Sequence, residues 1–468
     1  MKVLLVKPPS DMHVVLPPIG LGYLASSLKR SDASIEVSIV DCLKQGYDVL
    51  RFRGYLEKAN PDVVGFTAFT MEIASALKCA AAAKNYNPRI ITIVGGAHAS
   101  ASPQEVLRDR NVDFIFRGEA EESLPLFLKK LGANDFHGIG GLGYKENNTF
   151  RFNEIQPVED LDALAFPDYE LMKFREYPRM YFTKRFPAAP ILTSRGCPYD
   201  CTFCSAHKIS GRKWRFRSPE NIIAEIKMLH GKYGIREVSI WDDNFALSKE
   251  RALKFCRLLK EADLDLIWWC PNGVSLHTVD EELLAAMKAS GCYAVAFGVE
   301  SGSERVLKDM KKKLSLEKLR DTVSLAHKMG FRTQGFFIIG YPIEEERDIL
   351  KTIRLSKELP FSRASFCLFQ PLAGSEIYER LVTAKQLPLD LDSKDCEYSK
   401  PSIPTSGVSD LMRLKRWQRR AISEFYLRPG IFLGLLRENL SFDQLRELAV
   451  MAGKYIFQPE VKKERTVN

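Results

Sequence analysis

Three cysteines stand close together in the segment TSRGCPYDCTFCS, residues 193–205, with the spacing C-x3-C-x2-C. A structural zinc site usually has four ligands, often from two paired motifs. Here only Cys197, Cys201 and Cys204 cluster, with His207 as an imperfect fourth ligand. Three thiolates suit a four-iron, four-sulfur cluster whose fourth iron stays open to a small molecule. The spacing therefore favours an iron–sulfur cluster, with zinc as the alternative.

The other seven cysteines are scattered, mostly within apolar segments: Cys42, Cys79, Cys256, Cys270, Cys292, Cys367 and Cys396. A secreted disulfide framework is a short, cysteine-dense chain, whereas this chain has 468 residues. We therefore expect the seven to be small core residues. The N-terminus is too short for a signal peptide, and no apolar run approaches the ~20 residues that a membrane span needs. These features predict a cytoplasmic protein of two or three domains without a transmembrane segment.

The cysteine segment opens a second half of the chain, 190–390, in which strand and helix patterns alternate. Six strands are predicted, at Ile191–Thr193, Val238–Trp241, Leu266–Trp269, Ala294–Val299, Gly335–Ile339 and Ser365–Phe369. Between them, Ser218 is a predicted N-cap followed by Pro219, and Thr278 with Glu281 forms a predicted capping box. Six strand–helix units with right-handed crossovers curve into an open, partial (β/α)6 barrel. Functional residues should then lie at the carboxyl ends of its strands.

Residues 1–130 contain continuous apolar, β-branched runs that alternate with helical stretches, at Val3–Val6, Val37–Val40, Val63–Phe66, Ile90–Val94 and Phe114–Phe116. Such runs predict an α/β domain with a doubly wound, Rossmann-like parallel sheet that binds ligands at its carboxyl edge. Residues 131–189 are expected to be an irregular connector, and residues 391–468 a basic helical region. The connector contains a literal G-x-G-x-x-G from Gly138, but no strand precedes it and no helix follows it, so a turn and a strand are predicted there.

The cysteine segment and the barrel together resemble the radical S-adenosylmethionine (SAM) enzymes, in which an aromatic residue precedes the last cysteine, as Phe203 does here. In that family the open iron chelates SAM, and an electron from the cluster cleaves it to methionine and a 5′-deoxyadenosyl radical. The resemblance extends through WDDNF, PNGVS, FGVESGSERVL and LFQPLAGSEIYE. It implies cofactor-binding roles for Phe203, Asp242, Asp243, Asn244, Asn272, Glu300, Ser301 and Gln370, with Glu300 at the ribose. A solvated loop carboxylate is the alternative for each acidic residue.

Relatives with this barrel often carry an N-terminal cobalamin-binding domain, and KPPS, PPIGLGYLASSL, GFTAFT, VGGAHAS and FRGEAEESL resemble it. Gly95 and Gly96 allow a bulky flat ligand to approach the backbone, and Thr67 is placed to hydrogen-bond its nucleotide tail. The D-x-H-x-x-G motif that ligates cobalt is incomplete, because Leu16 stands at the glycine position. His13 is therefore not expected to bind cobalt. A degenerate domain that binds nothing is the alternative to bound cobalamin.

These resemblances imply a radical SAM enzyme, and relatives with both domains are commonly methyltransferases. We expect cobalamin-dependent methylation of an unactivated carbon of a small-molecule or lipid-like substrate. One SAM would supply the methyl group and a second the radical. The alternative is radical cyclisation, as in the anaerobic magnesium-protoporphyrin ester cyclase, or coupling or reduction, with a degenerate cobalamin domain. An external one-electron reductant of the flavodoxin or ferredoxin type is also implied.

Nucleic acid is the less favoured kind of partner. The formal charge is +9, and AHKISGRKWRFRS at 206–218 interleaves basic residues with Trp214 and Phe216, as RNA-binding surfaces do. Relatives that modify transfer RNA end in a small β-rich domain, whereas this C-terminus is predicted to be helical. A solvated rim is the simpler interpretation of the run. The basic residues Lys311–Lys313 hint instead at a phosphorylated or lipid-like partner.

Overall fold

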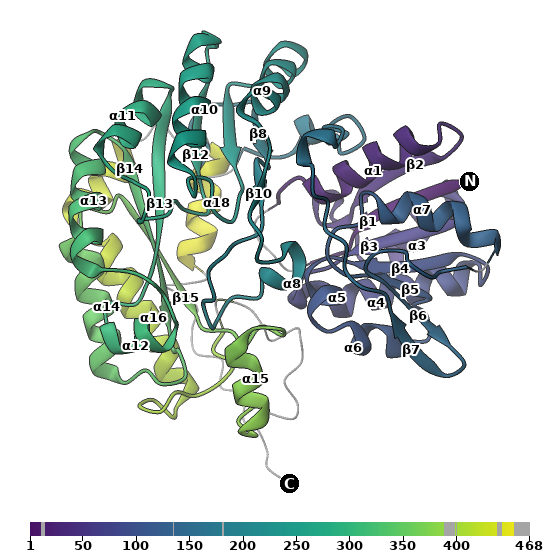
Figure 1. Cartoon of the computed structure of the whole chain (residues 1–468). Coiled ribbons are helices and arrows are strands. Elements are labelled where there is room, and N and C mark those ends of the chain that lie inside the picture. Colours follow the sequence, from purple (N-terminus) through teal and green to yellow (C-terminus); the bar gives the residue numbers. More distant parts are fainter. Residues whose placement is uncertain are drawn as a thin grey trace.

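The structure is a computed structural model of the chain and describes residues 1–10, 15–133, 135–179, 182–387, 398, 400–437 and 442–453. Figure 1 shows two α/β bodies side by side. The N-terminal body is purple and blue, the larger barrel is teal and green, and yellow C-terminal helices lie against the barrel. No helix within these ranges is long and apolar enough to cross a membrane.

The N-terminal body is built on a seven-stranded sheet in the order β2-β1-β3-β4-β5-β6-β7, of which β1 to β5 are parallel. Its strands are β1 (Lys2–Lys7), β2 (Glu36–Asp41), β3 (Val63–Thr67), β4 (Ile91–Gly95), β5 (Phe114–Phe116), β6 (Leu142–Glu146) and β7 (Thr149–Phe152). One face packs under α1 (Ile19–Ser31) and α7 (Ser123–Lys130), and the other under α3 (Val49–Ala59) and α4 (Ile73–Tyr86). Three short helices complete it, α2 (Cys42–Gln45), α5 (Ala97–Ala101) and α6 (Pro103–Arg108). The predicted doubly wound sheet is confirmed.

Two strands lie within the segment 131–189 that was expected to be irregular. β6 pairs antiparallel with β5, and β7 pairs antiparallel with β6. Gly143 of the G-x-G-x-x-G lies in β6, after a turn in which Gly138 has positive φ. The glycines therefore form a turn and a strand, as predicted. The second strand, β7, was missed because its alternation of apolar and polar residues is too short to stand out.

The barrel sheet is parallel throughout, in the order β15-β14-β13-β12-β11-β8. Its strands are β8 (Ala188–Ile191), β11 (Glu237–Ile240), β12 (Ile267–Cys270), β13 (Cys292–Glu300), β14 (Arg332–Ile339) and β15 (Arg363–Leu368). The first strand, predicted at Ile191–Thr193, ends earlier because Thr193 already turns to hydrogen-bond Asp242. The chain then forms β9 (Ser194–Arg195), which pairs antiparallel with β10 (Arg215–Phe216). The six predicted strands of a partial barrel are confirmed.

Helices cover the outer face of the barrel, where alternate strand residues join one large apolar core. The helices of this half are α8 (His207–Ser210), α9 (Pro219–Tyr233), α10 (Lys249–Glu261), α11 (Glu281–Ala289), α12 (Glu304–Asp309), α13 (Leu316–Lys328), α14 (Glu346–Glu358) and α15 (Glu376–Thr383). The Ser218 hydroxyl accepts a hydrogen bond from the Asn221 N–H at 3.2 Å and caps α9 as predicted. The predicted capping box at Thr278 is wrong. Asp280 caps α11 instead, because the Thr278 hydroxyl donates to the Ala246 carbonyl.

The predicted C-terminal helical region contains α16 (Leu411–Tyr426), α17 (Pro429–Arg437) and α18 (Phe442–Ala452). The Gln418 side chain of α16 donates to the Phe366 carbonyl at 2.7 Å, which fixes this helix against β15. The Gln444 side chain of α18 donates to the Thr183 carbonyl at 2.8 Å. The predicted helical character is confirmed for the described residues.

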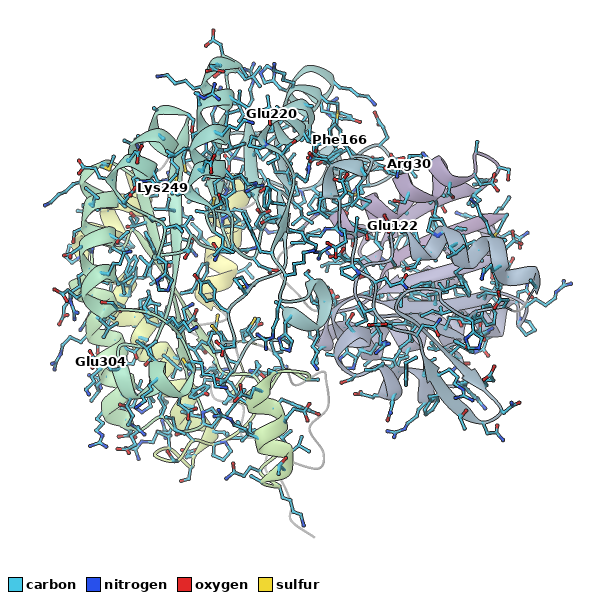
Figure 2. The ribbon with its side chains drawn as sticks, viewed as in Figure 1. Arg30, Glu122, Phe166, Glu220, Lys249 and Glu304 are labelled. Carbon is cyan, nitrogen blue, oxygen red and sulfur yellow. The ribbon has the colours of Figure 1, made fainter. Side chains whose placement is uncertain are left out.

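The connector binds the two bodies together where Figure 2 labels Arg30 and Phe166. Arg30 of α1 donates to the Ala163 carbonyl at 2.6 Å, and the Ser26 hydroxyl donates to the Phe166 carbonyl at 2.7 Å. On the barrel side, the Tyr169 hydroxyl donates to Glu225 at 2.9 Å. The connector is thus anchored on both domains by hydrogen bonds, of which the one at Arg30 is exposed and the one at Glu225 is buried.

Glu225 is fully buried and also forms an ion pair with Arg217, which is 3% exposed. Replacing Arg217 with Gln leaves this carboxylate buried without its charged partner. We expect the free energy of unfolding to fall by about 3–5 kcal/mol, measured by urea unfolding. The matched control is Arg257→Gln in the exposed pair with Glu261, which should cost less than about 0.5 kcal/mol. Equal unfolding midpoints for the two variants would contradict this role of the buried pair.

Candidate active site between the two domains

The cysteine loop is held from both sides by Thr202. The Thr202 N–H donates to the Met310 carbonyl at 3.0 Å, and its carbonyl accepts from the Ile377 N–H at 2.9 Å. Its hydroxyl lies 2.8 Å from the Tyr341 hydroxyl. Phe203 packs against the apolar cluster that contains Met310, Ile377 and Tyr341. The loop is thereby fixed to the elements that follow β13, β14 and β15.

Cys197, Cys201 and Cys204 are half-buried and close enough to interact electrostatically. Burial raises the pKa of all three thiols, to about 11 at Cys204, so a bound metal must displace their protons. In the described part of the chain, no three His, Cys, Asp or Glu side chains are grouped so as to hold a single metal ion. A cluster does not need that convergence, because each thiolate binds a different iron. The donor set fits a four-iron cluster better than zinc.

Three polar residues follow β11. The Asp242 carboxylate is buried and accepts hydrogen bonds from the Thr193 N–H at 2.6 Å and from the Ser194 hydroxyl at 2.6 Å. Asn244 is also buried, and its Oδ1 has no hydrogen-bond partner among the described residues. Asp243 lines the cavity described below, where desolvation and the charge of Asp242 raise the pKa of its carboxyl. Asp242 therefore supports the cysteine loop, and Asp243 faces open space.

Glu300 ends β13 in a left-handed backbone conformation (φ 65°), where the register with β14 shifts. This conformation costs a non-glycine residue about 1–3 kcal/mol and is typical of functional sites. Its Oε1 accepts a hydrogen bond from Lys312 Nζ at 3.0 Å. Burial alone would lower the pKa of Lys312, but the charges of Glu300, Cys201 and Cys204 hold it above its ordinary value. The sequence missed Lys312 as a site residue because it lies in a run of three lysines.

The side-chain amides of two predicted site residues, Asn272 and Gln370, form hydrogen bonds within the protein. The Asn272 amide is exposed and donates to the Trp241 carbonyl at 3.0 Å. The Gln370 side chain is buried, donates to the Lys400 carbonyl at 2.7 Å and accepts from the Ser402 hydroxyl. Gln370 thus ties the end of β15 to the segment before α16. The contact of either side chain with a cofactor stays a prediction.

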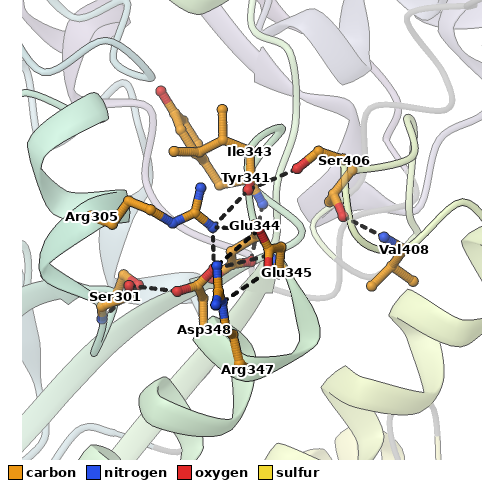
Figure 3. A network of polar contacts seen from close by, with 12 residues as sticks. Ser301, Arg305, Tyr341, Ile343, Glu344, Glu345, Arg347, Asp348, Ser406 and Val408 are labelled. Carbon is orange, nitrogen blue, oxygen red and sulfur yellow. Dashed lines mark hydrogen bonds and ion pairs between the residues drawn. The ribbon is translucent and has the colours of Figure 1, made fainter.

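Ser301 belongs to the support of the barrel loops. It is buried, and its hydroxyl lies 3.3 Å from the Thr352 hydroxyl. Figure 3 shows the adjoining network, in which Arg305 donates to the Ile343 carbonyl at 3.0 Å and pairs with Asp348. These bonds connect the loops that follow β13 and β14. No cofactor role of Ser301 is needed to explain its burial.

A cavity of about 290 Å³ lies between the two domains. Thr67, Gly95 and Gly96 belong to its N-terminal wall, and Trp241 and Asp243 to its barrel wall. The cavity also runs beside α1 and the sheet, where its walls are apolar: Val3, Leu5, Leu21, Leu24, Val63 and Ile93. One chamber therefore opens to the carboxyl ends of strands from both domains.

Gly96 allows the ends of β3 and β4 to converge at this wall. Its φ of 89° favours glycine, and a Cβ there would lie 2.7 Å from Thr67 Oγ1 and 3.0 Å from the Ala68 nitrogen. At Gly95 the nearest atom would be 3.7 Å away, which is ordinary contact. The structure brings the three predicted residues together, and their contact with cobalamin stays a prediction. His13 lies outside the described residues.

An ion-pair cluster joins the two walls, and the sequence did not predict it. Arg195, two residues before Cys197, donates to Glu121 at 2.7 Å and lies 3.3 Å from Glu119. Glu119 also forms a buried pair with Arg215. Both carboxylates come from the segment FRGEAEESL and both arginines from the segment around the cysteines. The sequence shows that one segment is acidic and the other basic, but it does not show that their side chains form ion pairs.

Part of the basic run 206–218 has a structural role. Arg215 and Arg217 are buried and pair with carboxylates. Trp214 and Phe216 lie with their ring centroids 5.6 and 5.4 Å from the Arg251 guanidinium. Packing therefore explains the buried arginines of this run, whereas Lys208, Arg212, Lys213 and the Phe216 ring are exposed.

The fold and site define a class of protein: a partial β/α barrel with an iron–sulfur loop, facing a cofactor-binding parallel sheet across one cavity. The Radical SAM superfamily profile matches residues 191–356, and the B12 binding domain profile matches residues 1–128. The solved structure of the SAM methyltransferase TsrM from Kitasatospora setae, with cobalamin and a [4Fe-4S] cluster, has the same fold. Its TM-score is 0.71 at 17% identity, covering 97% of this chain and 99% of that one.

Two curated relatives are similar over most of the chain. An uncharacterized methyltransferase of Pyrococcus horikoshii is 32% identical over 451 residues, 94% of this chain and 96% of the relative. The cytidylyl-2-hydroxyethylphosphonate methyltransferase of Streptomyces wedmorensis is 31% identical over 440 residues, 81% and 82% of the two chains. The chain therefore belongs to the family of cobalamin-dependent radical SAM methyltransferases. Its cofactors are a four-iron, four-sulfur cluster, SAM and cobalamin.

Replacing Cys197, Cys201 and Cys204 with alanine should abolish iron binding after anaerobic reconstitution, because these three half-buried thiols share one loop and are the soft ligands assigned to the cluster. Iron and sulfide analysis and the electron paramagnetic resonance spectrum of the reduced protein measure this. The control is Cys79→Ala in the N-terminal core, which should keep the full iron content. Stoichiometric zinc in place of iron in the unmodified protein would refute the assignment.

Gly96→Ala should reduce cobalamin retention, because the added Cβ meets Thr67 and the backbone at the cavity wall. The visible spectrum after hydroxocobalamin loading and gel filtration measures the retained corrin. Gly46→Ala is the matched control: Gly46 also has positive φ, 62°, but a Cβ there meets nothing within 4 Å. Full corrin retention in Gly96→Ala would contradict the role of this wall, and an equal loss in both variants would show that backbone strain is responsible instead.

Proposed function

We propose that the protein methylates an unactivated carbon of a small-molecule or lipid-like substrate in a cobalamin-dependent radical reaction. The observation that carries the proposal is the shared cavity, which Gly95 and Gly96 of the N-terminal sheet line together with Asp243 of the barrel. A methyl donor must lie close to the carbon that loses its hydrogen atom, since a radical reaction depends on that proximity. Both cofactor sites must then open to one chamber.

Charged residues beside the cluster loop suit SAM. In this proposal Lys312 binds its carboxylate and Glu300 its ribose hydroxyls, because the two lie 3.0 Å apart beside the thiols. Asp243 is available for its amino group, since the hydrogen bonds of Asp242 are taken up by the cysteine loop. The strained backbone of Glu300 holds its carboxylate in place before SAM arrives.

The N-terminal wall suits cobalamin. Gly95 and Gly96 admit the flat ring, and the apolar arm of the cavity beside α1 accommodates the nucleotide tail. When bound, the cluster and SAM supply the radical and cobalamin carries the methyl group. The apolar lining excludes water from the chamber, which protects a reactive carbon.

The chamber and a relative both bear on the substrate class. The walls are mostly apolar, and the Streptomyces relative acts on a nucleotide-linked phosphonate. The apolar walls favour a small molecule with an apolar part, whereas the relative's substrate is polar, so the proposal rests on the chamber. A cytoplasmic location completes the proposal and is supported by the cysteines of the described residues, all of which are free.

Turnover tests the reaction class. Reduced protein loaded with hydroxocobalamin, SAM and candidate substrates should release S-adenosylhomocysteine and 5′-deoxyadenosine in comparable amounts, because each methylation consumes two SAM molecules. Mass spectrometry should show products heavier by one methylene unit. Release of 5′-deoxyadenosine alone, from protein that retains no corrin, would replace methylation by cyclisation, coupling or reduction.

Glu300→Gln should weaken SAM binding about tenfold or more, because a charge-assisted hydrogen bond is lost. Equilibrium dialysis measures the dissociation constant, and the iron content should stay unchanged. Glu304→Gln is the control, since Glu304 is exposed at the start of α12 (Figure 2) and should leave SAM binding unaltered. Unchanged SAM binding in Glu300→Gln would make Glu300 a purely structural carboxylate.

A further inference from the structure

A second, smaller cavity lies where the connector meets β8, the edge strand of the barrel sheet, and we call it the side pocket. Its wall combines connector and barrel residues, among them Phe174, Arg175, Tyr177, Phe186, Pro190 and Trp241. The cavity measures about 40 Å³, which is room for about three water-sized spheres. The side pocket therefore admits a segment of a molecule and not a whole substrate.

The wall of the side pocket suits an apolar segment better than water. Among the described residues of the wall, hydroxyl groups belong to Tyr177, Thr183 and Ser239. The Tyr177 hydroxyl donates to Asp41 at 2.8 Å, and the Ser239 hydroxyl accepts from the Trp241 indole N–H at 3.0 Å. A trapped water needs about two to four polar partners, and most of the side-chain groups that could serve are already hydrogen-bonded. An alkyl chain or an aromatic edge needs no such partners.

Trp241 connects the side pocket with the shared cavity, because it lines both. Val238 and Ile240 of β11 belong to the outer apolar core, so the alternate residues Ser239 and Trp241 face the interior of the barrel. The hydrogen bond between these two side chains fixes the indole ring along the inner wall. A molecule that extends from the shared cavity into the side pocket would therefore run along the Trp241 ring.

Arg175 carries the charge of the side pocket. The other side chains among the described residues that line it are uncharged. Arg175 is exposed, and no described residue forms a hydrogen bond or an ion pair with its side chain. Its guanidinium is therefore available to an anion at the mouth of the pocket, and its fork of N–H donors matches a carboxylate or a phosphate.

The charges around Arg175 leave this mouth positive. Between 173 and 187 the connector has five cations and one carboxylate: Lys173, Arg175, Arg179, Lys184, Arg185 and Glu176. Glu176 is paired with Lys44 at 2.7 Å, and the exposed Asp265 is paired with Arg185 at 2.6 Å. Asp41 and Glu237 also contact this segment, but both carboxylates are buried and accept hydrogen bonds from tyrosine hydroxyls. The exposed carboxylates of the described residues in contact with this segment are thus already paired.

We propose that the side pocket binds the anionic end of the substrate. The inference deepens the proposed function and rests on it. The carbon that is methylated lies in the shared cavity, an apolar stretch of the substrate runs along Trp241 into the side pocket, and a terminal carboxylate or phosphate pairs with Arg175. The substrate class is therefore an amphipathic anion, an apolar chain or ring system with one charged end.

Two probes with the same chain test the charge at the mouth without turnover. The protein, loaded with its cluster and with hydroxocobalamin, is dialysed to equilibrium against carbon-14-labelled octanoate or octanol. Arg175→Gln should weaken octanoate binding about fivefold, because a charge-assisted hydrogen bond at a partly exposed site is lost, and should leave octanol binding unchanged. Salt at about 0.5 M should reduce the difference between Arg175→Gln and the original protein, because it screens the charge.

Lys173→Gln is the matched control, since Lys173 is an exposed cation of the same segment that does not line the side pocket. It should bind octanoate as the original protein does, and equal octanoate binding in Lys173→Gln and Arg175→Gln would overturn the proposal. Trp241→Ala should weaken both probes with unchanged iron content, because apolar contact is lost; unchanged binding of both would overturn the path along Trp241. If turnover gives no methylated product although octanoate binding depends on Arg175, the proposed function fails and the anion site remains.

Discussion

Glu119 and Glu121 lie between two arginines, Arg195 and Arg215, that belong to the other domain, and the chamber depends on this cluster of charges. All four side chains are at least largely buried, so removing any one of them would leave an unpaired charge out of water. Arg195 also stands two residues before Cys197, so the same contact that joins the domains sets the position of the cysteine loop. The two walls of the chamber are therefore joined by this ionic cluster as well as by the hydrogen-bonded connector.

Strand direction supplies the second constraint. The barrel sheet and strands β1 to β5 of the N-terminal sheet are parallel, so the loops after these strands gather at one edge of each sheet. Within the barrel, buried polar contacts then fix each loop: Asp242 to Thr193, Thr202 to Tyr341, and Glu300 to Lys312. Buried polar groups need hydrogen-bond partners. Because these partners lie on different loops, their hydrogen bonds fix the loops in one arrangement. The protein thereby holds Asp243, Lys312 and the thiols close enough to interact electrostatically.

Much of this organisation was predictable from local chemistry. Three cysteines in one short loop predicted an iron–sulfur site, and apolar runs predicted both parallel sheets. One helix end was predicted wrongly: the Thr278 hydroxyl bonds to the Ala246 carbonyl, which lies 32 positions earlier in the sequence, so Asp280 caps the helix instead. The contact of Gln370 with a cofactor stays a prediction, although its amide bonds to the segment before α16. Both side chains bond to residues remote in sequence.

The sequence by itself determined the donor atoms and the backbone freedom: the thiols of Cys197, Cys201 and Cys204, and the absence of a side chain at Gly96. These are properties of residue type and spacing, which no tertiary contact alters. Only the tertiary structure decided that Lys312 pairs with Glu300, that Arg195 meets Glu121, and that the walls of two domains enclose one chamber. Such pairings join segments that are far apart in the sequence. These segments come within contact distance only when the helices and sheets pack together.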